Sequence, residues 1–364
     1  MDVSSLTDSA RLAARRAAAA VAAGWPAHSR LLLVGERAGW VIDEELKSVA
    51  ALAERLGIRV ARRWPPSAAR RQSVFYGSHF TFFDQADALD LSNRVAIAYF
   101  HGLPGTPGMP EFDRAFAELR RLHERIDRVQ VSHREIEAIV LSSGIDAAKV
   151  HRIPIGVEPR LFSGPTPEAR RALGLPEDAF VVGSFQKDGV GWDEGLEPKP
   201  VKGPDVLVAA LAALHRRVRR LHVLLSGPAR GYVKAGLERH GVPYTHRVVA
   251  RYEEIGSLYA ALDAYVVPSR QEGGPKGVLE SMAAGVPLVS TRVGQAVDLV
   301  DDGENGLLVD VEDVEGLVDR LAAIADGRLD TSALVAAARV TADANSYVSQ
   351  LPLWRSFFEG FVAS

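Results

Sequence analysis

Short apolar segments alternate with helical segments along this chain, and this alternation restricts the folds that are open to it. The first half predicts strands at residues 31–34, 58–62, 73–76, 95–100, 128–131 and 150–155, with helices at residues 43–56, 109–123 and 133–143. Apolar strands joined by helices are typical of a parallel sheet that helices cover on both faces. The first half therefore predicts a doubly wound α/β domain.

The second half repeats this alternation. It predicts strands at residues 180–185, 222–225, 245–249, 264–267, 288–290 and 306–309, with helices at residues 205–216, 257–261, 277–284 and 314–325. Between the halves, Ser-Gly-Pro-Thr-Pro at residues 163–167 is typical of a linker. We therefore expect two Rossmann-like domains, residues 1–162 and 163–344, that face one another across a cleft. Ligands of such sheets bind at the carboxyl ends of the strands.

Composition excludes several classes of function. The length of 364 residues exceeds what one ordinary core needs, which agrees with two domains. A formal net charge of -3 argues against nucleic-acid binding through a basic surface. The sequence has no cysteine, which excludes disulfides, thiolate metal sites and cysteine nucleophiles. No apolar run reaches membrane-spanning length, so we expect a cytoplasmic enzyme.

Residues 269–287, SRQEGGPKGVLESMAAGVP, predict a strand end, a glycine-rich turn and a helix in succession. Glu272 precedes the turn, and Glu280 lies in the helix with seven residues between the two. A carboxylate offers several lone pairs and so accepts neighbouring sugar hydroxyls well. We expect Glu272 to bind sugar hydroxyls and Glu280 to bind ribose hydroxyls. The alternative is a solvated strand–turn–helix with two surface glutamates.

The turn between the glutamates favours an anion. Free backbone N–H groups at a helix start bind anions, and the helix dipole adds to this attraction. Gly273, Gly274 and Gly277 carry no side chain, so the main chain can approach a phosphate closely. The segment therefore suits a ligand with a sugar at one end, phosphate in the middle and ribose at the other.

In these residues the chain resembles the retaining glycosyltransferases of family 4, which have the GT-B fold. The family signature is a glutamate, a glycine-rich turn, a second glutamate after seven residues, and a small-residue helix ending in Gly-x-Pro, here Gly285-Val286-Pro287. The usual Glu-Gly-Phe-Gly opening is Glu272-Gly273-Gly274-Pro275 in this chain. The resemblance implies that the C-terminal segment 345–364 crosses back to the first domain as a helix. It also implies a donor site formed by Glu280, Gly273, Gly274, Pro275, Lys276 and Gly277.

The resemblance further assigns two lysines to the donor diphosphate. The Lys-Gly pair of the family matches Lys202-Gly203. The family also has an arginine that falls on Ser184 here, so we expect Lys187 to take its place. Lysine is a compact, rotatable charge that suits phosphate oxygens. The alternative is two solvated loop lysines.

The loop at residues 188–201 is longer than is usual in the family. It carries an aromatic residue among carboxylates, namely Trp192 with Asp193, Glu194 and Glu197. We expect this loop to line the acceptor side, with Trp192 stacking on a ring. A plain surface loop is an equally good interpretation of the sequence.

In the first domain, His101 follows the strand at residues 95–100, where the family has a histidine near the donor sugar and the acceptor. His79 follows the strand at residues 73–76 and is a further candidate on the acceptor side. Gly35 and Gly39 flank the first strand–helix turn, where the family usually has adjacent glycines near the phosphates. The alternative for both histidines is a structural role in a loop.

Some motifs are absent. Neither a Gly-x4-Gly-Lys-Ser/Thr loop nor a Gly-x-Gly-x-x-Gly after the first strand is present, which argues against a P-loop nucleotidase and a dehydrogenase. No Asp-x-Asp follows a strand where it could hold a divalent ion, so we expect no metal. We also expect no cofactor apart from a nucleoside diphosphate sugar as co-substrate.

The resemblance implies transfer of a sugar, with retention, to a hydroxyl of a small molecule, a glycan or a lipid-linked acceptor. Lys202, Lys187, Glu272 and His101 are the residues expected at the reacting groups. Two alternatives stay open. One is a GT-B enzyme that hydrolyses or epimerises the sugar nucleotide, and the other is a non-catalytic protein that binds it.

Overall fold

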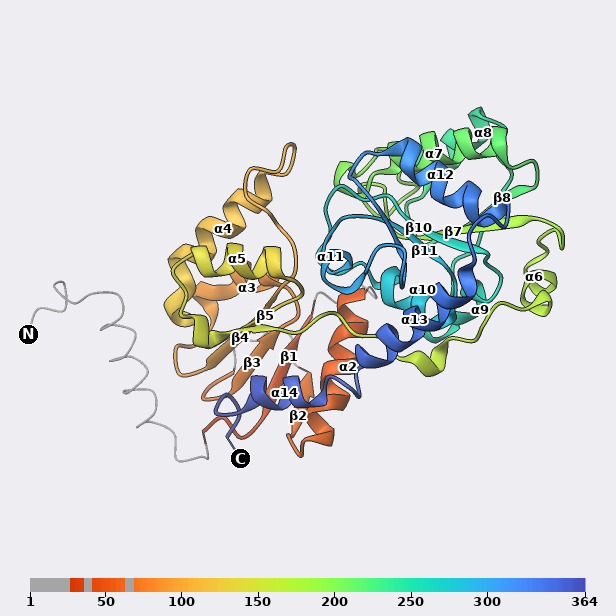
Figure 1. Cartoon of the computed structure of the whole chain (residues 1–364). Helices are drawn as coiled ribbons and strands as arrows, with labels where there is room; N and C mark the ends of the chain where they lie inside the picture. The colour runs from red at the N-terminus through yellow and green to blue at the C-terminus, as the bar shows by residue number, and fades with distance from the viewer. Residues whose placement is uncertain (1–26, 36–40, 63–68, 364) are drawn as a thin grey trace, which may run out of the picture. The chain divides into compact units, whose positions relative to one another are not determined.

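The computed structural model describes residues 27–35, 41–62 and 69–363. They form two compact units, of which one holds the described residues up to Pro154 together with those from Gln350 onward. The other unit is Ile155–Ser349, so the expected linker after Phe162 lies inside it. The described residues of each unit contain one parallel six-stranded sheet, with helices between the strands (Figure 1). The expected α/β fold class is therefore confirmed.

The sheet of the first unit has the strand order β2-β1-β3-β4-β5-β6. Its strands are β1 Leu31–Val34, β2 Val60–Arg62, β3 Ser73–Tyr76, β4 Arg94–Tyr99, β5 Arg128–Val131 and β6 Val150–Arg152. Its helices are α2 Val41–Arg55, α3 His79–Gln85, α4 Pro110–Leu122, α5 Arg134–Ser142 and α14 Leu351–Phe358. All residues of β1 and β3 are buried, as expected for central strands of a covered parallel sheet.

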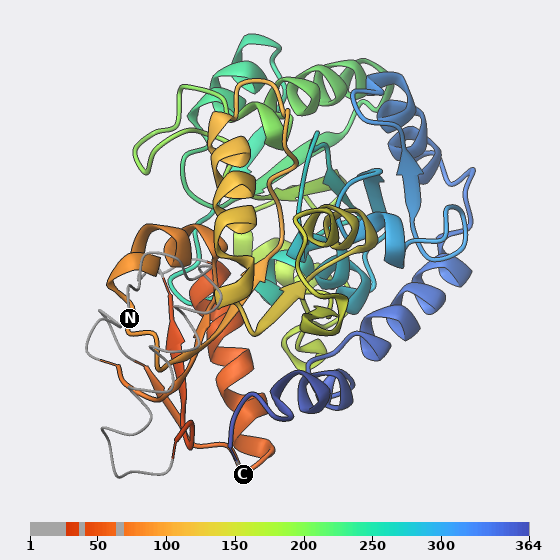
Figure 2. The ribbon, with the colours of Figure 1, turned by 90° about the vertical axis from the view of Figure 1, so that its left-hand side faces the viewer.

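The C-terminal helix α14 belongs to the first unit, where it lies beside α2 (Figures 1 and 2). Phe75 of β3 makes edge-to-face contacts with Trp354 and Phe357, at ring-centroid distances of 6.1 and 5.7 Å. The hydroxyl of Ser73 donates to the carbonyl of Phe361 at 2.6 Å. These aromatic contacts bury large apolar rings against the sheet and so hold the end of the chain there.

The sheet of the second unit has the strand order β12-β11-β10-β7-β8-β9. Its strands are β7 Phe180–Phe185, β8 Leu221–Ser226, β9 Tyr244–His246, β10 Ala264–Val267, β11 Leu288–Thr291 and β12 Leu307–Val309. Its helices are α6 Pro167–Leu173, α7 Pro204–Arg217, α8 Gly231–Arg239, α9 Ile255–Tyr259, α10 Lys276–Ala284, α11 Ala296–Leu299, α12 Val314–Ala325 and α13 Thr331–Ala344.

The direction in which successive strands are added to this sheet reverses between β7 and β10. From β7 it builds outward through β8 to β9, and it then returns to add β10, β11 and β12 on the other side. The loops after β7 and β10 therefore leave the same edge of the sheet, and the chain continues from them toward opposite sides of the sheet. In parallel α/β sheets such a switch point is where ligands bind.

Several expected segments are shorter in the structure, among them the strands expected at residues 58–62 and 150–155, which are β2 and β6. The strand expected at residues 245–249 is β9, Tyr244–His246, and Val248 beyond it is 65% exposed. Among the described residues, the pairing of β9 with β8 ends at His246. The helix expected at residues 345–364 is α14, Leu351–Phe358. In the part of the chain that the structure describes, every helix is too short or too polar to cross a membrane.

Candidate functional site

The loops that leave β7 and β10 bring Lys202 and Glu272 into direct contact. The Lys202 Nζ atom lies 2.7 Å from Oε1 and 2.6 Å from Oε2 of Glu272. The hydroxyl of Ser269 donates to the same Oε1 at 2.9 Å. The Glu272 side chain is only 8% exposed, whereas that of Lys202 is 25% exposed. The expected donor-site lysine and glutamate are thus one hydrogen-bonded group.

Backbone contacts hold these two loops together. The N–H groups of Arg270 and Gln271 both donate to the carbonyl of Val201, at 2.9 and 3.0 Å. Gly203 adopts a left-handed conformation, with φ of 61°, and a Cβ atom there would lie 2.1 Å from the carbonyl oxygen of Pro268. Only glycine fits this close approach. Packing therefore requires a glycine directly after Lys202, and this packing sets the position of Lys202.

Lys187 follows β7 and lies near Lys202. Partial burial lowers the pKa of Lys187, and the charge of Lys202 lowers this pKa further. The Lys187 Nζ atom also lies 4.7 Å from the ring centroid of Trp192, a cation–π contact. The structure therefore brings the two expected lysines and Trp192 to the same edge of the sheet.

Glu280, on α10, is buried and is held by two tyrosines. The hydroxyl of Tyr252 donates to Oε1 at 2.5 Å, and that of Tyr259 donates to Oε2 at 2.9 Å. Burial and the Glu280 charge raise the pKa of both tyrosines well above its ordinary value, so both hydroxyls stay protonated donors. The tyrosines lie 28 and 21 residues before Glu280, and no local pattern in the sequence indicates them.

The glycine-rich turn packs tightly against the protein behind it. A Cβ atom on Gly274 would lie 2.7 Å from Oε1 of Gln295, and one on Gly277 would lie 2.5 Å from the ring of Tyr265. Pro275 precedes the first helical residue of α10, Lys276, which is buried. The Lys276 Nζ atom donates to the hydroxyl of Tyr347 at 2.9 Å. Both glycines are thus required by protein packing, in addition to the expected approach of a phosphate.

A fully buried ion pair lies behind Lys187, and the sequence did not predict it. The Nε atom of Arg230 is 3.1 Å from Oδ1 of Asp188, and both side chains are 0% exposed. Arg230 also donates to the carbonyl of Ser184 at 2.6 Å and to its hydroxyl at 3.2 Å. A guanidinium therefore contacts the position where the family has its arginine, but it comes from the loop after β8. Burial raises the pKa of Asp188, although the Arg230 charge opposes this rise.

The loop at residues 188–201 is anchored through its backbone. Val190 donates to the carbonyl of Glu197 at 2.9 Å, and Gly231 donates to that of Glu194 at 2.6 Å. Trp192, within this loop, is 56% exposed. An exposed indole on an anchored loop presents a fixed apolar surface beside Lys187.

His79 and His101 meet in the first unit, because β3 and β4 are neighbours and both histidines follow the carboxyl ends of these strands. Their ring centroids lie 5.8 Å apart, and His79 stacks on Tyr99 at 3.9 Å. Burial, followed by the charge of His101, holds the pKa of His79 well below its ordinary value. A Cβ atom on Gly35 would lie 2.7 Å from Leu46 of α2, so this glycine serves packing there. Gly39 lies outside the described residues.

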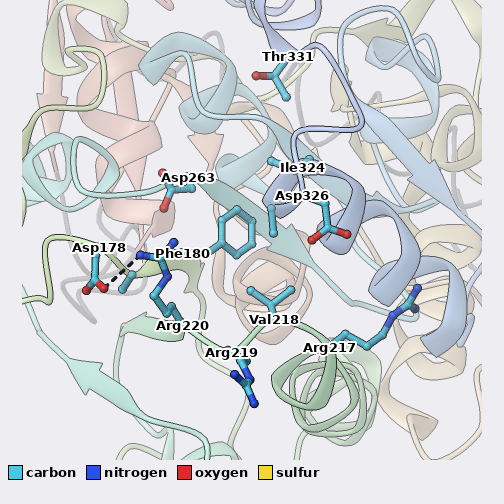
Figure 3. Close-up of a pocket in the computed structure, with 12 residues that line it drawn as sticks. Asp178, Phe180, Arg217, Val218, Arg219, Arg220, Asp263, Ile324, Asp326 and Thr331 are labelled. Atoms are coloured by element: carbon cyan, nitrogen blue, oxygen red, sulfur yellow. Dashed lines mark hydrogen bonds and ion pairs between the residues drawn. The ribbon is translucent and has the colours of Figure 1, made fainter.

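A surface hollow of about 500 Å³ opens at the opposite edge of the second sheet (Figure 3). Phe180 and Asp263, which line it, lie where β7 and β10 begin. Some of the charged side chains that line it are in ion pairs: Arg220 contacts Asp178 at 3.1 Å, and Asp263 contacts Arg170 at 2.6 Å. This hollow is therefore not the candidate site. No group of three or more metal-ligating side chains is found among the described residues.

Comparison with solved structures defines the class of fold. The structure superimposes on that of Anabaena Alr3699/HepE in complex with UDP-glucose with a TM-score of 0.71, at 18% identity, over 92% of this chain and 100% of that one. It matches sucrose-phosphate synthase from Thermosynechococcus elongatus with a TM-score of 0.62, at 21% identity, over 88% of this chain and 79% of that one. The fold is the GT-B fold of glycosyltransferases, as expected.

Sequence comparisons show which proteins the chain is similar to. Residues 194–326, which lie within the second unit, match the family described as Glycosyl transferases group 1. The chain is 35% identical to a D-inositol 3-phosphate glycosyltransferase of Saccharomonospora viridis over 55% of this chain and 47% of that protein. It is 31% identical to the lipopolysaccharide core biosynthesis mannosyltransferase LpsB of Rhizobium meliloti, over 54% of this chain and 57% of that protein. The resemblance to family 4 is thereby confirmed. The chain spans about half the length of these curated relatives.

Proposed function

We propose that this protein transfers a sugar from a nucleoside diphosphate sugar to a hydroxyl group of an acceptor, with retention of configuration. The observation that carries the proposal is the Lys202–Glu272 pair, with Lys187 beside it, at the switch point of a glycosyl transferases group 1 domain. The relatives named above act on sugars, and one structural neighbour was solved with UDP-glucose. We therefore take a uridine nucleotide as the first donor to test.

The two lysines hold the diphosphate in this proposal. An ammonium group has three donors, so Lys202 can bind a phosphate oxygen while it remains bonded to Glu272. Lys187 adds a second positive charge from the end of β7, and the first turn of α10 adds backbone N–H groups. Fixed charges that are aimed at the departing diphosphate stabilise the negative charge that develops on it. No metal ion is required for that role.

The carboxylates orient the two ends of the donor. Glu272 accepts hydroxyls of the sugar, next to the anomeric carbon, and its contact with Lys202 couples sugar and phosphate binding. Glu280 accepts the ribose hydroxyls through the lone pairs that Tyr252 and Tyr259 leave open, because a carboxylate has about four such sites. The tyrosines fix the plane of the Glu280 carboxylate before the ribose arrives.

The reaction breaks the bond between the anomeric carbon and the oxygen of the β-phosphate, and the diphosphate leaves with the electron pair. The acceptor oxygen bonds to the anomeric carbon on the same face, and its proton passes to an oxygen of the departing diphosphate. No protein nucleophile is needed for this sequence. In the second unit we assign Trp192 to the acceptor, because a small-molecule or glycan ring can stack on its exposed indole. In the first unit we assign His101, with the neighbouring His79, to the acceptor.

Thermal stabilisation and turnover test the proposal together. A ligand that binds only the folded state raises the melting temperature, so UDP, GDP, ADP and dTDP are compared first. The sugar nucleotides of the best binder are then incubated with and without a panel of hydroxyl acceptors. Acceptor-dependent release of the diphosphate supports a transferase. Release that does not depend on any acceptor supports a hydrolase or epimerase instead, and binding without turnover supports a binding protein.

A further inference from the structure

Gln295 is a fully buried glutamine that makes two opposed hydrogen bonds to a single residue. Its Oε1 atom accepts from the N–H of Ile155 at 2.9 Å, and its Nε2 donates to the carbonyl of Ile155 at 3.3 Å. The side chain is 0% exposed, so water cannot replace either bond. A buried amide in this arrangement fixes both the N–H and the carbonyl of Ile155, because any shift leaves polar groups unsatisfied.

The backbone of the same residue holds the glycine-rich turn. The N–H of Gln295 donates to the carbonyl of Gly273 at 3.0 Å. Gly294, with φ of 52°, lets the chain approach so closely that a Cβ atom there would lie 2.6 Å from the Gly273 carbonyl oxygen. A Cβ atom on Gly274 would lie 2.7 Å from both the amide oxygen of Gln295 and the Ile155 side chain. The turn is thus packed between Gln295 and Ile155.

Ile155 is itself a fixed point in the second unit. It is the first residue of that unit, and its side chain is buried. Two residues later, Val157 pairs with Ser346 and accepts the N–H of Tyr347 at 3.1 Å. Gln295 therefore links the turn to a segment that is held by other parts of the unit.

We propose that Gln295 is a positioning residue that sets the turn at Glu272–Gly274 for the diphosphate of the donor. This inference rests on the proposed function, because it gives the turn the role of holding that diphosphate. Gln295 acts through the turn and touches no reacting atom. Loss of its amide loosens the turn, so the affinity for a nucleoside diphosphate falls while the affinity for the nucleoside alone does not.

The test compares Gln295→Met with a matched control, Gln130→Met. Methionine has the length of glutamine without the amide. Gln130 is also buried and donates to a backbone carbonyl, that of Ile153 at 3.2 Å, but it lies on β5 of the first unit. The ligands are the nucleoside diphosphate that stabilises the wild type most among UDP, GDP, ADP and dTDP, and the corresponding nucleoside.

For Gln295→Met we expect the dissociation constant of the diphosphate to rise roughly tenfold and that of the nucleoside to change less than about twofold. Amide hydrogen exchange in the peptide that covers residues 270–280 should become faster. The control variant should change neither measurement. An unchanged ratio of the two dissociation constants in Gln295→Met, or the same change in the control, overturns the inference.

A second variant, Gln295→Glu, covers the case in which Gln295→Met does not fold. A protonated glutamic acid can accept from Ile155 N–H and donate to its carbonyl, whereas an ionised one cannot donate. Relative to wild type at the same pH, diphosphate affinity should approach the wild-type value at pH 5 and fall at pH 8. If the ratio of the diphosphate dissociation constants of Gln295→Glu and wild type does not depend on pH, the inference is overturned. If the wild type binds none of the four diphosphates, the proposed function fails and this inference fails with it; wild-type binding with unaltered variants overturns this inference alone.

Discussion

The Nζ atom of Lys202 lies 2.7 and 2.6 Å from the two carboxylate oxygens of Glu272. The residue assigned to the diphosphate of the donor and the residue assigned to its sugar therefore form one ion pair. Lysine at this position contacts the carboxylate that is proposed to orient the sugar, and it retains a donor for the phosphate. A change in either residue therefore alters the charge that faces the scissile bond and the position of its partner.

Lys202→Ala should lower kcat/KM for sugar transfer by roughly 10²–10³-fold, because a fixed positive charge at the departing diphosphate is lost. Lys234→Ala, which removes a lysine from α8 of the same unit, serves as the control and should leave kcat/KM within about twofold. Circular dichroism should show that both variants are folded. Turnover by Lys202→Ala at the wild-type rate would contradict the assigned role.

Tyr259→Phe should destabilise the protein by about 1–3 kcal/mol, because Glu280 is buried and loses a hydrogen-bond donor. Tyr244→Phe is a matched control, since its hydroxyl donates to Glu238 at 2.5 Å in an exposed position. Tyr244→Phe should lower the free energy of unfolding much less. Urea unfolding measures both free energies, and the KM for the sugar nucleotide should rise in Tyr259→Phe alone. Equal costs in the two variants would mean that the Glu280 carboxylate is not held in the way described.

The buried pair of Arg230 and Asp188 should be sensitive to the loss of one partner. Asp188→Asn leaves a buried guanidinium without its counter-charge and should cost about 3–5 kcal/mol. The double variant Asp188→Leu with Arg230→Met removes both charges and should cost less than the sum of the single variants Asp188→Leu and Arg230→Met. A double-mutant cycle by urea unfolding measures this coupling. Additive costs would show that the pair does not act as a unit.

Acid should destabilise the first unit through His79. Its pKa is held well below 6.5 in the folded protein, chiefly by burial, whereas the unfolded chain takes up a proton near pH 6.5. The unfolded state thus binds more protons at acidic pH, and the free energy of unfolding falls as pH drops below about 6.5. His79→Leu should flatten this dependence by up to about 1.4 kcal/mol per pH unit. Urea unfolding from pH 7.5 to 5.5 compares the slopes, and equal slopes would refute the effect of burial on His79.

The fold could be predicted from the sequence because its signal is local. Apolar strands and intervening helices recur with short spacing, and the parallel sheet follows from them. The positions of Lys202, Glu272 and Glu280 could also be predicted, since they belong to a contiguous motif or to a Lys-Gly pair beside a predicted strand.

The supporting residues could not be predicted in the same way. Gln295 bonds a residue 140 positions away, and Arg230 bonds Ser184 at a separation of 46. Such contacts depend on which strands become neighbours, and no spacing in a single sequence encodes that order. The glycine-rich turn itself could be predicted, because its glycines are adjacent in the sequence. A Cβ atom on Gly274 or Gly277 would meet protein atoms, however, where the sequence suggested only a phosphate.

Metal dependence offers an independent test of the diphosphate site. If the two lysines and the first turn of α10 neutralise the departing group, sugar transfer should proceed at the same rate in excess EDTA as in added Mg²⁺. The rate of diphosphate release in the two conditions is the measurement. A rate that falls to background in EDTA and returns with Mg²⁺ would show that a divalent cation carries that charge.

The most direct test of the whole account is calorimetric titration of the wild type and Lys202→Ala with UDP, GDP, ADP and dTDP. The account predicts that one of these diphosphates binds the wild type and that its dissociation constant rises at least about tenfold in the variant, because a charge-assisted contact is lost. Absence of binding by all four, or identical binding by the wild type and the variant, would contradict it.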